Sequence, residues 1–100
     1  MSAIRVEWAA VPGRAQDVEA ALEGEGLAPT RWGNGPGFRY GEHVHSYDKV
    51  LVCVEGGIVF HTGDGDVGLG PGDRLELPAG VRHAATVGDL GVTCVEAPRP

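Results

Sequence analysis

The sequence predicts one small all-β domain, a sandwich or barrel of short strands, preceded by a short strand and one helix. The chain has 100 residues, which is the usual size of a single domain. Its 17 glycines and 7 prolines are about twice the usual share, while 42% of its residues are apolar. Many turns between buried segments follow from that composition, and from residue 38 onward apolar segments alternate with glycine-containing turns.

The N-terminal part, residues 1–36, is expected to hold a strand, a helix and a loop. Residues 4–8 alternate apolar and charged side chains, the period of a strand with one buried face. A helix that ends at Gly24 or Gly26 follows. Its apolar side chains recur three and four positions apart: Ala15, Val18, Ala21 and Leu22. Residues 28–37 show no period and predict a surface loop.

The barrel is expected over residues 37–97, as seven short strands. They are predicted at residues 38–45, 49–54, 57–62, 66–69, 73–77, 82–87 and 91–96. The strongest hairpin turn lies at residues 63–66, because an Asp-Gly pair accepts the positive backbone angles of a tight turn.

Charge and composition exclude several classes of function. A net charge of −6 disfavours nucleic acid and anionic membranes as partners. The chain has no long apolar run and no basic, apolar start typical of a secretory signal, so we expect a cytoplasmic protein. Cys53 and Cys94 are too few for a disulfide framework and are expected to be free and buried. Nucleophile, phosphate-loop and dinucleotide motifs are missing from the sequence.

Histidines carry the strongest chemical signal. His43 and His45 stand two apart in a strand-like segment, so their rings project from one face with Cα atoms about 6.6 Å apart. One metal ion could bind both. A third histidine, His83, follows a Pro-Ala-Gly turn at residues 78–80. His61 alternates with apolar residues and is expected to face solvent or the opposite sheet.

These histidines lie in two segments that resemble the paired motifs of the cupin superfamily. The first segment is Gly41-Glu42-His43-Val44-His45 followed by Gly56, and the second holds Gly72, Pro78, Gly80 and His83. The resemblance spans residues 37–87 and implies a small jelly-roll barrel. It also implies that His43, His45 and His83 meet around a divalent metal inside that barrel.

Lys49 is the main departure from the motif, because cupins carry a glutamate at this position. Counting in twos from His43 places Lys49 on the inner face, with Tyr47, Leu51 and Cys53. A protonated lysine about 5 Å from a dication raises the energy by roughly 6 kcal/mol at an effective dielectric constant of about 20. Four arrangements are therefore open. Lys49 is neutral, or a carboxylate or bound anion offsets its charge, or its side chain is turned outward, or no metal binds.

Three neutral imidazoles without a carboxylate suit zinc, iron, nickel or copper better than magnesium or calcium. Three protein ligands leave open positions for water or substrate, and the resemblance implies an oxygenase or isomerase acting on a small acid. We expect Lys49, Tyr47 and Arg39 to line the pocket, with Lys49 binding an anionic ligand. The alternative is a non-catalytic metabolite-binding or sensor cupin, with or without metal, in which Lys49 replaces the usual glutamate.

A homodimer is expected, because a small barrel gains buried apolar surface by pairing. Trp8 and Trp32 are expected on the outside of the barrel or against the partner subunit.

Overall fold

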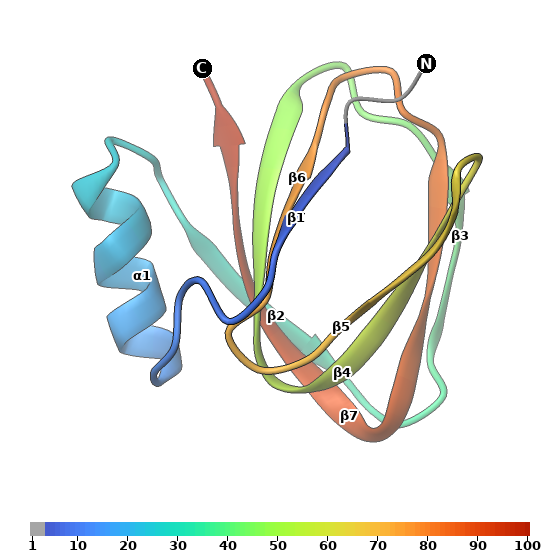
Figure 1. Ribbon diagram of the computed structural model, residues 1–100, viewed down its shortest axis with the longest axis horizontal. Coiled ribbons are helices and arrows are strands. Elements are labelled where there is room, and N and C mark those ends of the chain that lie inside the picture. Colours follow the sequence, from blue (N-terminus) through green and yellow to red (C-terminus); the bar gives the residue numbers. More distant parts are fainter. Residues whose placement is uncertain (1–3) are drawn as a thin grey trace.

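The computed structural model describes residues 4–100, and strands dominate it (Figure 1). A short strand β1 (Arg5–Glu7) and a single helix α1 (Ala15–Gly24) come first. Six strands follow: β2 (Thr30–Asn34), β3 (Arg39–His43), β4 (Asp48–Thr62), β5 (Gly65–Leu69), β6 (Arg74–Leu77) and β7 (His83–Arg99). The predicted all-β fold with a leading strand and helix is confirmed.

The long strands β4 and β7 organise the sheet, because they pair antiparallel along their length. The first half of β4 pairs with β6, which pairs with β1, and the second half pairs with β5. The C-terminal half of β7 pairs with β2, and its N-terminal half pairs with β3. Two half-sheets therefore face each other, in a jelly-roll arrangement, and share the bent strands β4 and β7 (Figure 1).

The predicted barrel is open. Within residues 4–100, the hydrogen-bonded path through the sheet ends at β1 on one side and at β2 on the other. Among the described strands, only β4 and β7 join the two half-sheets, and apolar side chains pack part of the space between them.

The bend in β4 explains why two predicted strands form a single one. The ladder with β7 shifts register between Cys53 and Glu55 and again between Gly56 and Ile58. Gly56 has a φ of +73°, and a Cβ atom there would lie 1.9 Å from the carbonyl oxygen of Gly91. Glycines therefore bend the strand without ending it, whereas the sequence predicted a break. The predicted strands at residues 82–87 and 91–96 likewise form the single strand β7.

The loop predicted over residues 28–37 is wrong in part, since Thr30–Asn34 forms β2. Gly33 contributes no side chain and so interrupts the alternation of side chains that would indicate this strand. A Cβ atom at Gly33 would lie 2.7 Å from the carbonyl oxygen of Val92 on β7, so the close strand approach excludes any side chain there. The barrel therefore begins before residue 37.

Alternation along the strands builds two cores. Leu51 and Cys53 on β4 point between the half-sheets, where both cysteines are free and buried, as the sequence predicted. The intervening Val50 and Val52 point to the other face, where α1 covers them with Val18 and with other apolar residues, including Leu22. No helix among residues 4–100 is long and apolar enough to cross a membrane.

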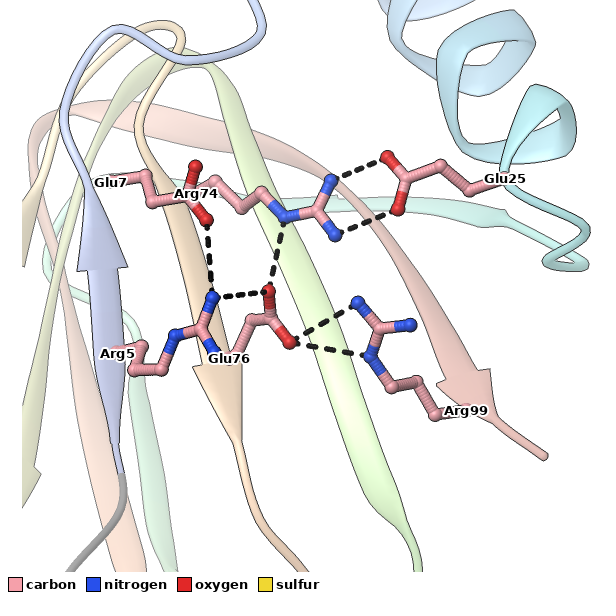
Figure 2. Close-up of polar contacts among 6 residues, drawn as sticks. All are labelled: Arg5, Glu7, Glu25, Arg74, Glu76 and Arg99. Atoms are coloured by element: carbon pink, nitrogen blue, oxygen red, sulfur yellow. Dashed lines mark hydrogen bonds and ion pairs between the residues drawn. The ribbon is translucent and has the colours of Figure 1, made fainter.

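An ion-pair network fastens the end of α1 to the sheet (Figure 2). The Arg74 guanidinium donates hydrogen bonds of 2.6 and 2.8 Å to the two carboxylate oxygens of Glu25, just after the helix. Glu76, beside Arg74 on β6, pairs with Arg99 at 3.2 Å and with Arg5 at 4.0 Å. The network thus links β1, β6, β7 and the helix on the outer face of one half-sheet.

Candidate metal centre

Strand pairing brings the three predicted histidines together. His43 ends β3 and is the cross-strand partner of His83, which begins β7. His45 lies in the segment after β3, where its carbonyl oxygen accepts a hydrogen bond of 2.9 Å from the amide of Gly80. One ring nitrogen from each histidine can be chosen so that all three lie within 4.8 Å of one another. Such a cluster is compact enough to bind one metal ion.

Backbone carbonyls orient two of the rings. Nδ1–H of His43 donates to the carbonyl oxygen of Gly41 at 2.7 Å, and Nδ1–H of His83 donates to that of Val81 at 2.9 Å. In each ring the proton is then on Nδ1 and the lone pair is on Nε2, the usual arrangement of a metal-binding histidine. Nε2 of His83 is buried and has no hydrogen-bond partner. A buried polar atom without a partner is costly, and a metal ion would satisfy it.

Lys49 points inward, as the alternation predicted, and is buried. Its Nζ lies 3.2 Å from Nε2 of His45 and 3.4 Å from Oε1 of Glu96. Of the alternatives open from the sequence, the structure shows a carboxylate that offsets the lysine charge. His45 consequently differs from the other two histidines, because its Nε2 already accepts a hydrogen bond.

Glu96 is a charged site residue that sequence reasoning missed. It lies on β7, and its Oε1 also accepts a hydrogen bond of 2.8 Å from Nε1 of Trp32. The signal was present in the alternation, because Val92 and Cys94 share the inner face of β7 and the next residue in that series is Glu96. A carboxylate in an inward series of apolar residues indicates a buried charge pair or a ligand site.

Burial is the largest cause that lowers the pKa values of His45 and His83 below the ordinary value for histidine. The nearby charges of Lys49 and His43 lower both pKa values further, while Glu96 opposes them. The carbonyl of Val81 also opposes the shift at His83. Both imidazoles are therefore held in the neutral form, which is the form that binds a metal.

A cavity of about 350 Å³ adjoins these residues, between the two half-sheets. Its lining combines polar side chains with the apolar residues Ile58, Phe60 and Ala85. Within this lining, the Asn34 amide donates a hydrogen bond to the Tyr40 hydroxyl. The residues that line the cavity are Trp32, Asn34, Tyr40, His43, Lys49, Ile58, Phe60, His83, Ala85 and Glu96.

Two other predicted pocket residues lie elsewhere. Arg39 is exposed on the outer face of β3, in a shallow groove beside His61. The reason is a register shift between Tyr40 and His43, which turns Tyr40 inward in place of Arg39. Tyr47 is 40% exposed, and its ring centroid lies 5.0 Å from that of His45, outside the cavity lining.

The other aromatic and histidine residues differ in how well their positions agree with the sequence predictions. Trp32 lines the cavity rather than the outside of the barrel, since β2 is part of the sheet, whereas Trp8 is exposed. His61 faces outward, where it forms hydrogen bonds of 2.8 Å with Asp66 and with Thr86. It therefore takes no part in the three-histidine cluster.

The donor set fits a transition metal. Three imidazoles, two of them with an oriented Nε2 lone pair, match the preference of zinc, iron, nickel and copper for nitrogen ligands. Lys49 opposes metal binding, because its amine already donates a hydrogen bond to the third imidazole, that of His45.

The family model for the cupin domain matches residues 32–94 of the chain, which include all three histidines. The chain belongs to the cupin family. The match begins within β2, in agreement with the place of that strand in the sheet.

Solved structures agree with this assignment. A cupin domain from Bordetella pertussis is 30% identical, with a TM-score of 0.58, over 74% of this chain and 82% of that one. A chain from the crystal structures of the DMSP lyases RdDddP and RnDddQII is 31% identical, with a TM-score of 0.68, over 74% of this cupin. The match spans only 38% of that lyase chain. A cupin superfamily protein from Desulfitobacterium hafniense covers 95% of this chain at 18% identity and a TM-score of 0.65, so that likeness concerns the fold alone. No functionally curated protein matches the sequence.

Proposed function

We propose that this cupin binds one divalent transition metal through His43, His45 and His83 and receives a small anionic molecule in the adjoining cavity. The buried, unpartnered Nε2 of His83 is the observation that carries the proposal. A metal held by three imidazoles keeps open positions and supplies a Lewis acid that polarises a bound oxygen.

The chain's own residues would select and orient the ligand. The cavity volume is near the lower end of small-molecule sites, so the ligand is small. The Lys49 ammonium can donate a hydrogen bond to a ligand carboxylate, and its pairing with Glu96 fixes its position. Ile58 and Phe60 form an apolar wall that excludes water from one side of the ligand.

For the reaction, we propose metal-dependent conversion of a small acid, as an oxygenase, an isomerase or a lyase. The lyase class is supported by the 31% identity to the DMSP lyase structures. A non-catalytic metabolite-binding or sensor role is the second candidate, favoured by the hydrogen bond from Lys49 to His45. Oxygen consumption and product analysis with a panel of small acids that includes DMSP would separate the two.

Metal analysis tests the site itself. We expect about one equivalent of zinc, iron, nickel or copper per chain, lost in His83→Ala and in His43→Ala. The matched control is His61→Ala, which removes a histidine outside the cluster and should leave the metal content unchanged. Equal metal content in all four proteins, or none in the wild type, would contradict a three-histidine site.

Quaternary state and location stay predictions of the sequence. The exposed side chain of Trp8 beside the edge strand β1 supports a homodimer. Light scattering after size-exclusion chromatography should show twice the chain mass, and a 10.4 kDa particle at micromolar concentration would contradict the dimer. A cytoplasmic location is proposed on the sequence alone.

A further inference from the structure

The Lys49 ammonium lies between a metal ligand and a carboxylate. Its Nζ has two partners among the described residues, Nε2 of His45 at 3.2 Å and Oε1 of Glu96 at 3.4 Å. The side chain retains only 7% of its exposure, so solvent offers little replacement for a lost partner. The position of the Lys49 amine therefore depends on both partners.

The two partners of Lys49 differ in how many donors or metal ions they can accept at once. Nε2 of a neutral imidazole has one lone pair, which either accepts a hydrogen bond or binds a metal. A carboxylate has room for about four donors, and the Trp32 indole occupies one position on Glu96. Glu96 can therefore hold the ammonium by itself, whereas His45 cannot serve Lys49 and a metal together.

We propose that Lys49 and the metal ion compete for Nε2 of His45, and that Glu96 holds the ammonium when the metal binds. This inference rests on the proposed three-histidine metal site. Lys49 then competes with the metal and so sets the metal affinity of the site, and Glu96 positions the Lys49 side chain. The replacement of the usual glutamate by lysine thus weakens metal binding without abolishing it.

The decisive test is the double variant Lys49→Met/Glu96→Gln. It removes the competing amine, and it keeps the summed charge of the pair at zero, as in the wild type. Zinc affinity is measured by titration against a chromophoric chelator at fixed pH and ionic strength. Competition predicts at least tenfold tighter zinc binding by the double variant. An unchanged affinity would overturn the proposal.

A second measurement follows zinc binding in the wild-type protein, and a variant is needed only to assign the resonance. The ¹⁵N resonance of the Lys49 ammonium is assigned by its loss in Lys49→Met. It should shift on addition of one equivalent of zinc, because the amine leaves His45. A resonance that stays in place while zinc binds would mean that His45 binds through Nδ1 or not at all, and would refute the competition.

The outcomes distinguish this inference from the proposed function. Zinc binding by the wild type with no gain in the double variant refutes the competition and leaves the metal site standing. Zinc binding by the double variant alone would mean that Lys49 excludes metal from the wild type, and this would overturn both the proposed wild-type site and the release of His45 to the metal. If neither the wild type nor the double variant binds zinc, iron, nickel or copper, the proposed site and this inference are both contradicted. Circular dichroism melting of each variant verifies that it is folded.

Discussion

Trp32 and Glu96 meet inside the cavity from two neighbouring strands, the indole Nε1 of β2 donating to the carboxylate Oε1 of β7 at 2.8 Å. This hydrogen bond fixes the carboxylate that pairs with Lys49. It also holds one of the two tryptophans of the chain in the cavity that adjoins the candidate metal centre, while the other, Trp8, is exposed. The strand that supplies Trp32 is the one that the sequence predicted as a loop.

Trp32 should report metal binding. In Trp8→Phe, whose remaining indole lines the cavity, one equivalent of copper(II) is expected to quench most of the tryptophan emission, because a paramagnetic ion at the histidines lies in the same cavity. In Trp32→Phe, whose remaining indole is exposed, the same addition should change the emission little. Equal quenching in the two variants would contradict a metal beside Trp32.

Gly56→Ala is expected to destabilise the fold severely, by at least about 3 kcal/mol. The new Cβ would lie 1.9 Å from the carbonyl oxygen of Gly91, at a φ of +73° that alanine rarely adopts. Gly24→Ala is the control, since a Cβ there meets nothing within 4 Å and helix propensity should raise stability by up to about 1 kcal/mol. Urea unfolding followed by circular dichroism measures both, and a Gly56→Ala protein as stable as the wild type would disprove the tight bend.

Leu22→Ala should cost about 2–4 kcal/mol, because this helix residue is fully buried against the outer face of the sheet. Leu90→Ala removes the same atoms from a side chain that is 88% exposed and should change stability by less than about 0.5 kcal/mol. Chemical unfolding gives both values. Similar losses in the two variants would show that α1 does not depend on this contact.

Glu25→Gln should lower stability by about 1–2 kcal/mol at neutral pH, between the values for an exposed and a buried ion pair. The Glu25 side chain retains 38% of its exposure and that of Arg74 retains 9%. The hydrogen bonds from Arg74 hold the pKa of Glu25 below its ordinary value of 4.5 in the folded state. The pair therefore contributes fully above that ordinary value, and its contribution is lost as the pH falls through the lowered folded pKa.

Melting temperatures from pH 7 to pH 2 test this sign. The gap between wild type and Glu25→Gln should be widest near neutrality and close in acid. Glu23→Gln, on the exposed side of the same helix, should follow the wild type throughout. A gap that widens in acid would mean that Glu25 stabilises the protein in its protonated form.

Local patterns in the sequence were enough for much of the fold. The period of Val18 and Leu22 predicted the helix, and the alternation through Lys49, Leu51 and Cys53 predicted which side chains of β4 point inward. Such patterns can be recognised because a helix or strand places residues on the same face at a fixed spacing along the chain. Where glycine replaced a side chain, as at Gly33 and Gly56, the pattern was interrupted and a strand was missed or divided.

Spacing and alternation, which are local properties of the sequence, predicted short strands of a sandwich or barrel, the paired His43 and His45 and the inward Lys49. The resemblance to cupins implied the jelly roll and the meeting of these histidines with His83. Only the tertiary structure decided the partner of Lys49, the inward turn of Tyr40 in place of Arg39, and the position of Trp32 in the cavity. Each depends on register between strands that are distant in the chain. Register is set by bulges and by close backbone contacts, which the order of residues within one strand does not reveal.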